Sequence, residues 1–154
     1  MSFSRPGHHL LVAHERTSRR TLLRRQPNKT PHTVVHNLAH LLGRLPPGRC
    51  RSLTFDNGIE FSKHHLLQRR FGISTWFCDT HSPWQKGGIE NAIGRIRRFL
   101  PRRTNLHALS PEHIFRSALA YNHTPRKCLD FHTPAEVFSK LLHFKRDSTS
   151  LMSR

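Results

Sequence analysis

Residues 77–91 read FCDTHSPWQKGGIEN, and this stretch runs from a strand through a polar loop into a helix. We expect the strand over 73–78, where β-branched and aromatic residues are concentrated. The polar loop covers 79–86 and contains Pro83. Two glycines then open a helix expected over 89–100. This succession of elements is typical of a mixed α/β domain.

The rest of the chain continues the same alternation on both sides. Upstream, we expect a hairpin of strands 9–13 and 20–23, a helix from Thr30-Pro31 to Gly43, a strand over 51–55 and a helix over 60–70. Downstream, Ser110-Pro111-Glu112 and the capping-box sequence Thr133-Pro134-Ala135-Glu136 each begin a helix. We therefore expect a disordered leader over 1–8, a core over 9–140 and a C-terminal tail over 141–154, frayed after Phe144.

The composition indicates a nucleic-acid partner. The chain has 154 residues, enough for one domain, and carries 26 Lys and Arg against 9 Asp and Glu, a formal charge of +17. Such an excess favours a polyanion. At 35% hydrophobic residues the chain is too polar for a membrane span and too apolar for a solvated arm.

The cysteines indicate a reducing compartment. Cys50, Cys78 and Cys128 lie far apart, and none forms a CxxC pair, so the sequence predicts neither a disulfide framework nor a zinc ribbon. The apolar run 10–13 is too short for the core of a signal peptide. We expect a cytoplasmic protein, which in a bacterium has access to the nucleoid.

Acidic residues are scarce, so Asp56 and Glu90 stand out. Asp56 follows a strand and begins Asp-Asn-Gly, a sequence that favours an Asx-type turn, and this segment alone supports the turn better than a metal ligand at the strand's carboxyl end. Glu90 flanks an apolar stripe and has Ile93 and Gly94 at the positions where a helical ion-pair partner would stand. Glu90 therefore suits a metal ligand that leans over the adjoining sheet. Asp79 in its loop and Glu60 in a first helical turn fit structural roles better.

The central segment resembles the catalytic core of the DDE transposases of the insertion sequence thirty group, relatives of retroviral integrases with an RNase H-like fold. The resemblance rests on 77–87 with Glu90-Asn91, and continues through Ile96-Arg97, Leu100-Pro101-Arg102, Asn122, Pro125-Arg126-Lys127 and Thr133-Pro134-Ala135-Glu136. Upstream, Glu15-Arg16-Thr17-Ser18-Arg19 and Asp56-Asn57-Gly58 match family motifs. The likeness covers residues 10–140 and implies a mixed sheet flanked by helices.

The resemblance also implies a mechanism. In that family Asp, Asp and Glu hold two Mg²⁺ ions, and Mn²⁺ is an alternative. Asp56 and Glu90, which are 34 positions apart, match the second and third of these ligands. Carboxylate oxygens suit Mg²⁺, and two such ions support in-line displacement at phosphorus. The implied reaction is cleavage at transposon ends followed by strand transfer into target DNA.

One departure from the family pattern affects this mechanism directly. No Asp precedes Asp56, and Glu15, the one upstream acid, matches the Glu-Arg-x-Ser-Arg motif rather than the first catalytic position. The first strand of the sheet is therefore expected to be missing, as are the N-terminal DNA-binding helices of such transposases. The chain then reads as the product of a truncated element, with weak or no activity alone.

Basic and aromatic residues surround the expected site. Those expected to contact DNA are Lys86, Arg95, Arg97, Arg98, Arg102 and Arg103, although a charge run is more often a solvated face. Trp84 is either a stacking surface for a base or a packing anchor. The scattered histidines lack metal-site spacing.

Three functions remain open on the sequence alone. The first is a DDE transposase catalytic-core fragment. The second is a non-catalytic DNA-binding remnant that interferes with an intact transposase by mixed assembly, or forms a homo-oligomer. The third is a basic architectural protein, a function that gives no reason for the spacing between Asp56 and Glu90.

Overall fold

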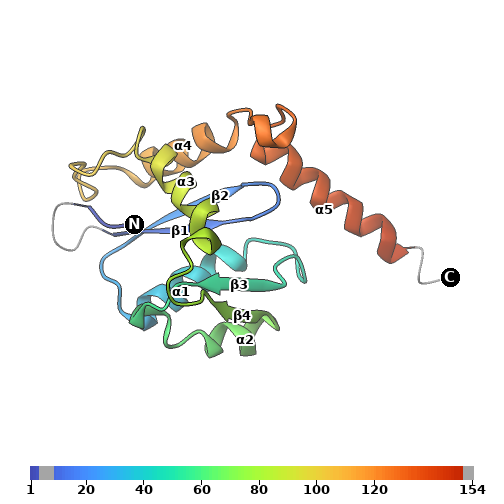
Figure 1. Cartoon of the computed structure of the whole chain (residues 1–154), viewed down its shortest axis with the longest axis horizontal. Coiled ribbons are helices and arrows are strands. Elements are labelled where there is room, and N and C mark those ends of the chain that lie inside the picture. The colour runs from blue at the N-terminus through green and yellow to red at the C-terminus, as the bar shows by residue number, and fades with distance from the viewer. Residues whose placement is uncertain (4–8, 151–154) are drawn as a thin grey trace.

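The computed structural model describes residues 1–3 and 9–150, with side chains up to residue 142. Its elements are β1 (His9–His14), β2 (Thr21–Gln26), α1 (Pro31–Leu42), β3 (Ser52–Phe55), α2 (His65–Phe71), β4 (Ser74–Phe77), α3 (Gly87–Ile96), α4 (Pro111–Asn122) and α5 (Pro134–Ser150). Short 3-10 helices follow β3 (η1, Ile59–Phe61), precede α3 (η2, Pro83–Lys86) and precede α5 (η3, Lys127–Leu129). The expected mixed α/β architecture is confirmed (Figure 1).

The strands form two separate pairs in the described part of the chain. β1 and β2 are antiparallel, with His9 opposite Gln26 and His14 opposite Thr21. β3 and β4 are parallel, with Ser52 opposite Ser74. The two pairs do not join into the single mixed sheet that the sequence analysis expected. Because β3 and β4 are parallel, the loops that follow them leave the same edge of their sheet.

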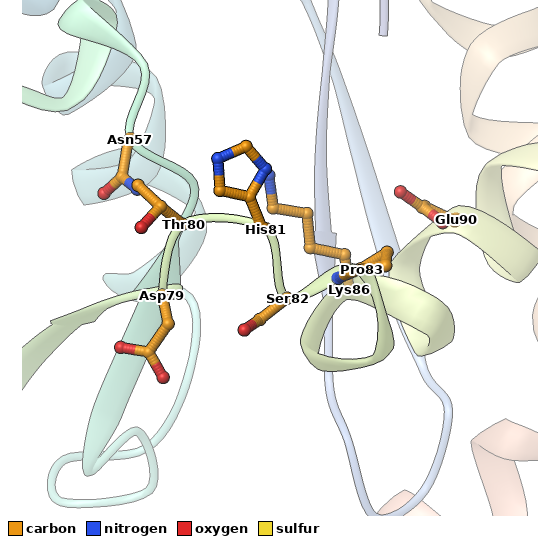
Figure 2. Close-up of a pocket in the computed structure, with 8 residues that line it drawn as sticks. All are labelled: Asn57, Asp79, Thr80, His81, Ser82, Pro83, Lys86 and Glu90. Atoms are coloured by element: carbon orange, nitrogen blue, oxygen red, sulfur yellow. The ribbon is translucent and has the colours of Figure 1, made fainter.

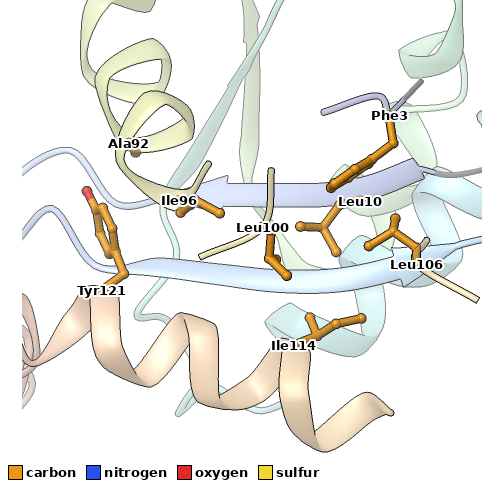
Figure 3. Packing of buried hydrophobic residues seen from close by; sticks show 8 residues of the cluster. All are labelled: Phe3, Leu10, Ala92, Ile96, Leu100, Leu106, Ile114 and Tyr121. Carbon is orange, nitrogen blue, oxygen red and sulfur yellow. The ribbon is translucent and has the colours of Figure 1, made fainter. Parts of the chain in front are cut away.

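The hairpin forms the middle layer between two hydrophobic cores. Neighbouring side chains of a strand point to opposite faces, so Leu10 and Leu11 of β1 enter different cores. The Leu10 core contains Phe3, Ala92, Ile96, Leu100, Leu106, Ile114 and Tyr121 (Figure 3). The Leu11 core contains Val34, Leu38, Ala39, Leu41, Phe55, Leu67 and Ile73. In Figure 1, α3 and α4 accordingly lie on one side of the hairpin, and α1, β3, β4 and α2 lie on the other.

The helix starts predicted from capping sequences are confirmed. The Thr30 hydroxyl accepts a hydrogen bond from the amide of Thr33 at the start of α1. The Ser110 hydroxyl accepts one from His113 at the start of α4. At the start of α5 the capping box closes in both directions, because the Thr133 amide donates to Glu136 and the Glu136 amide donates to Thr133.

Two predicted helix boundaries are wrong. The single helix expected over 60–70 is divided into η1 and α2, because the ring of Phe61 stacks on Phe55 at 4.6 Å and residues 62–64 turn between the two helices. α3 ends at Ile96 rather than at residue 100. Pro101 disfavours a helical conformation at Leu100, whose side chain is instead fully buried.

Both ends of the described chain carry regular structure. The Phe3 side chain is buried, and Ser2 forms an antiparallel bridge with His9 of β1. Residues 4–8 lie outside the described residues. At the other end α5 continues to Ser150, so the backbone expected to fray after Phe144 is helical as far as that residue. Among the described residues, no helix combines the length and the apolar character needed to cross a membrane.

Candidate functional site

Asp56 follows β3 directly and stands in a tight turn. One carboxylate oxygen, Oδ1, accepts a hydrogen bond from the Gly58 amide at 3.3 Å, which is the Asx-type turn considered above. The other oxygen, Oδ2, lies 3.9 Å from the ammonium of Lys86, and half of the Asp56 side chain remains exposed. The turn therefore leaves one face of the carboxylate open to solvent and to a ligand.

The loop after β4 is fastened to the loop after β3. The Cys78 amide donates to the Phe55 carbonyl at 2.8 Å, and the Asn57 side chain donates to the Cys78 carbonyl at 3.0 Å. Both bonds join residues that follow or end the parallel strands. They hold the beginning of the polar loop beside Asp56.

Asp79 closes this polar loop through Gln85 and also lines the cavity described below. Its amide donates to the Gln85 side chain at 2.9 Å, and Gln85 donates back to the Asp79 carboxylate at 2.8 Å. Figure 2 shows the Asp79 carboxylate pointing away from His81 and Glu90. The geometry agrees with the structural role expected for Asp79.

Glu90 stands in the first turn of α3, exposed to solvent, and lines an open cavity with Lys86, Asn57 and the polar loop (Figure 2). Lys86 lines the same cavity one helical turn earlier, and its ammonium is the group that faces Asp56. Lys86 thus contacts Asp56 at the end of β3 and shares a cavity with Glu90 at the start of α3, whereas Asp56 does not line that cavity. Within the described residues, however, no three His, Cys, Asp or Glu side chains converge as a metal site.

Glu60 lies closer to Asp56 than its assignment to a helix suggested. A side-chain carbon placed on Gly58 would meet the Glu60 carboxylate at 2.5 Å and that of Asp56 at 3.0 Å. Both carboxylates therefore lie close to the backbone at Gly58, and a side chain at this position would displace the Glu60 carboxylate. The signal available in the sequence was the glycine between the two acids.

Glu15 lies in the turn between β1 and β2, where it accepts hydrogen bonds from the backbone. Its carboxylate accepts hydrogen bonds from the amides of Thr17 and Ser18 and from the Ser18 hydroxyl. Burial opposes ionisation of Glu15, but these hydrogen bonds outweigh it and hold its pKa below the ordinary value. Glu15 therefore fixes the turn between β1 and β2.

The basic residues expected at a DNA surface have different environments. Arg95, Arg98, Arg102 and Arg103 are exposed, whereas Arg97 is half-buried. Trp84 in η2 is 75% exposed, so it is not the packing anchor that a loop tryptophan often is. Trp84 follows Pro83, a lining residue of the Glu90 cavity, but does not itself line that cavity.

Comparisons with known proteins identify transposases similar to this chain. No family model matches the chain. The transposase for insertion sequence element IS1086 of Cupriavidus metallidurans is 37% identical over 83% of this chain and 38% of its own length. The transposase InsI for insertion sequence element IS30C of Escherichia coli K12 is 34% identical over 86% of this chain and 34% of its own length. The chain thus spans little more than a third of the length of these curated relatives.

The fold also has a counterpart among solved structures. The catalytic core domain of BIV integrase superposes with a TM-score of 0.75, covers 95% of this chain and 93% of its own, and is 21% identical. The α/β architecture described above is therefore that of an integrase catalytic core. Over most of its length, the chain is a homologue of the transposases of the insertion sequence thirty group, with the fold of an integrase catalytic core.

Proposed function

We propose that this chain is the core of a DDE transposase that cleaves and joins DNA strands with Mg²⁺ or Mn²⁺. The observation that carries the proposal is that Lys86 contacts Asp56 and lines the same cavity as Glu90. The names of the chain's relatives indicate the kind of reaction, which is transposition. Transposon ends and target DNA are therefore the proposed partners. Such a protein acts beside the nucleoid in the bacterial cytoplasm.

The carboxylate oxygens present are the type of ligand that a hard divalent cation prefers, but the third acid of the family pattern is missing. Asp56 and Glu90 offer carboxylate oxygens, which Mg²⁺ prefers, and Glu60 lies near Asp56. When bound, the metal supplies charge stabilisation for an in-line displacement at phosphorus. Lys86 holds the Asp56 carboxylate in place and presents a positive charge to a phosphodiester.

We further propose that a third carboxylate belongs at or beside residue 1, on a first strand that runs along β1. The Met1 ammonium donates to the Leu10 carbonyl at 3.0 Å, and the Leu10 amide donates to the Met1 carbonyl at 3.0 Å. Since backbone groups alternate sides along a strand, those of Val12 and His14 face the same edge as those of Leu10. A strand that runs into Met1 would pair with them.

Two observations support residue 1 as the position of that carboxylate. The Met1 side chain packs on the core that contains Ala92 of α3, the helix that also carries Glu90. Burial is the main reason that the pKa of the Met1 ammonium is lowered, and the charges of Glu60 and Asp56 act on it in the opposite direction. Residue 1 therefore packs against the same core as α3.

A second candidate function is a DNA-binding remnant without catalysis. It is favoured by the lack of a third metal-binding acid among the described residues and by the ion pair that occupies Asp56. In this alternative the chain binds DNA, forms a homo-oligomer or joins an intact transposase in a mixed assembly, and thereby interferes with transposition.

Metal binding and strand cleavage separate the two candidates. The purified chain is titrated with Mn²⁺ while amide resonances are followed, and is then incubated with a labelled transposon-end duplex and Mg²⁺ or Mn²⁺. We expect broadening at Asn57, Gly58 and Asn91, and product that Glu90→Gln removes. Glu112→Gln, an exposed acid on α4 paired with Arg116, is the matched control and keeps both signals. Equal product from wild type and Glu90→Gln would overturn the enzyme proposal.

A further inference from the structure

A second cavity lies along a different face of α3 and is walled by basic residues. Its walls carry Arg19, Arg95 and Arg126, together with His14 and the Gly87-Gly88 start of α3. Among the described residues that line it there is no aspartate or glutamate. Three guanidinium groups around one hollow repel one another unless an anion lies between them.

The guanidinium group of Arg126 is buried and fixed by its neighbours in the wall of this cavity. The residue is only 8% exposed, and its guanidinium lies over the Tyr121 ring at 4.4 Å and donates from Nη2 to the Tyr121 carbonyl at 3.0 Å. Its Nε is buried and has no hydrogen-bond partner in the structure. A buried cation with an unsatisfied donor is costly, so a protein that keeps one has a use for it.

His14 and Arg19 face the first turn of α3 from the hairpin. The His14 Nδ1 shares a hydrogen bond of 2.9 Å with the Thr21 hydroxyl, which leaves a buried Nε2 without a partner. A side-chain carbon on Gly88 would meet the Arg19 Nη1 at 3.2 Å and the His14 Nε2 at 3.6 Å. The glycine therefore lets both basic groups approach the backbone at the start of the helix.

The start of α3 adds its own positive potential. Lys86 precedes the helix and makes no side-chain hydrogen bond to its first amides. Amide groups at a helix N-terminus favour an anion, and guanidinium groups match the oxygens of a phosphate. The three guanidinium groups and the amides at the start of α3 are thus donors toward the same kind of ligand.

We propose that this cavity binds a phosphodiester group of DNA next to the phosphodiester that faces Glu90. The same turn of α3 separates the two cavities, with Lys86 and Glu90 on one side and Gly88 and Asn91 on the other. A DNA strand presents phosphates in series, so one strand can occupy both sides of this turn. The identification of the polyanion as DNA rests on the proposed function, whereas the phosphate chemistry rests on the cavity alone.

The test uses the full chain in EDTA, so that it does not depend on metal binding or cleavage. A DNA duplex and, separately, inorganic phosphate are titrated while the Gly88 and Asn91 amides and the His14 imidazole are followed by NMR. With duplex, we expect these resonances to shift. We also expect Arg19→Asn and Arg95→Gln each to reduce the slope of log K against log salt by about 0.9, the share of one phosphate contact. Asn tolerates the left-handed backbone that Arg19 adopts, with φ of 63°.

Arg69→Gln is the charge-matched control, because Arg69 is exposed on α2 and does not line this cavity. Its salt slope is expected to equal that of the wild type. The proposal is overturned if duplex leaves the Gly88 and His14 resonances unmoved, if the cavity variants and Arg69→Gln have equal slopes, or if only inorganic phosphate moves the resonances. Failure of the proposed function would instead appear as absent Mn²⁺ broadening, which this experiment does not measure.

Discussion

Asn122 holds the edge of β2 as a neighbouring strand would. Its side-chain amide accepts from the Thr21 amide at 2.9 Å and donates to the Thr21 carbonyl at 2.8 Å. Both residues are buried, and they are about a hundred positions apart in the chain. One amide side chain therefore fastens α4 to the hairpin.

Replacing this amide should destabilise the protein strongly. Asn122→Ala leaves a buried N–H and a buried C=O of Thr21 without partners, so the free energy of unfolding should fall by about 2–4 kcal/mol. Urea unfolding followed by circular dichroism measures the change. Glu112→Ala, which removes an exposed pair on the same helix, should cost less than about 0.5 kcal/mol. Equal losses in the two variants would show that the amide bridge is not what fastens α4.

His14 makes stability sensitive to mild acid. Burial, followed by the charge of Arg19, lowers its pKa to about 4, while Glu15 acts in the opposite direction. An unfolded chain takes up the proton near the ordinary pKa of about 6.5, so the free energy of unfolding should fall as the pH drops from 6.5 to about 4. His14→Gln should reduce this slope, whereas the exposed His123→Gln should not.

The His14 prediction has a direct spectroscopic check. Urea unfolding at several pH values in this range gives the slope, and an NMR titration of the imidazole gives the midpoint. A His14 midpoint near 6.5, or the same slope in His14→Gln as in the wild type, would contradict the burial of this ring.

At the scale of elements, two glycines on helices should respond in opposite directions to the same change. Gly72 ends α2 in the left-handed conformation, with φ of 63°, where a side chain is strained. Gly94 lies inside α3, and no atom stands within 4 Å of where its side-chain carbon would be. Gly72→Ala should lower the free energy of unfolding by about 1 kcal/mol, and Gly94→Ala should raise it by about 0.5–1 kcal/mol. Thermal unfolding of both variants measures the contrast, and a loss in both would show that the Gly94 face of α3 is covered.

The elements that could be predicted are those whose ends are decided locally. Thr30, Ser110 and Thr133 mark helix starts because each hydroxyl accepts a hydrogen bond from the amide three residues later. The division between η1 and α2 could not be predicted, since it depends on Phe61 reaching Phe55 of another element. A capping hydrogen bond can be predicted from one short segment, whereas the contact between Phe61 and Phe55 cannot.

The same distinction applies to the two cavities. Asp56 and Glu90 were found because a strand end and an unpaired acid are local signals, reinforced by the family resemblance. Arg126 is more than a hundred positions away from His14 and Arg19 of the hairpin, and it meets them only because α4 packs on the hairpin. Arg19 and Arg126 stand in segments that carry the family resemblance, but nothing in those segments indicates that the two side chains share a cavity.

For the whole molecule, an upstream strand should unite the two halves. We would extend the chain before residue 1 with five alternating apolar and polar residues and compare Met1→Asp with Met1→Asn in that longer protein. Pairing with β1 should raise the free energy of unfolding equally in both. The Asp form alone should bind Mn²⁺ more tightly, by about tenfold or more, because a third carboxylate joins Asp56 and Glu90.

Calorimetry gives both quantities for the extended chains. A matching Mn²⁺ affinity in the Asp and Asn forms would show that residue 1 does not reach the metal site. Unchanged stability in both forms would show that the edge of β1 does not accept the added strand.

The two tryptophans of this chain lie largely in solvent, Trp76 at 63% and Trp84 at 75% exposure. Their fluorescence should therefore change little when the protein unfolds. Trp84 lies in η2 between Pro83 and Lys86, which line the Glu90 cavity, so a base that stacks on it should quench its emission, while Trp76 on β4 supplies a steady background. Intrinsic fluorescence should therefore report unfolding of this protein poorly, but it should report the binding of nucleic acid near Trp84.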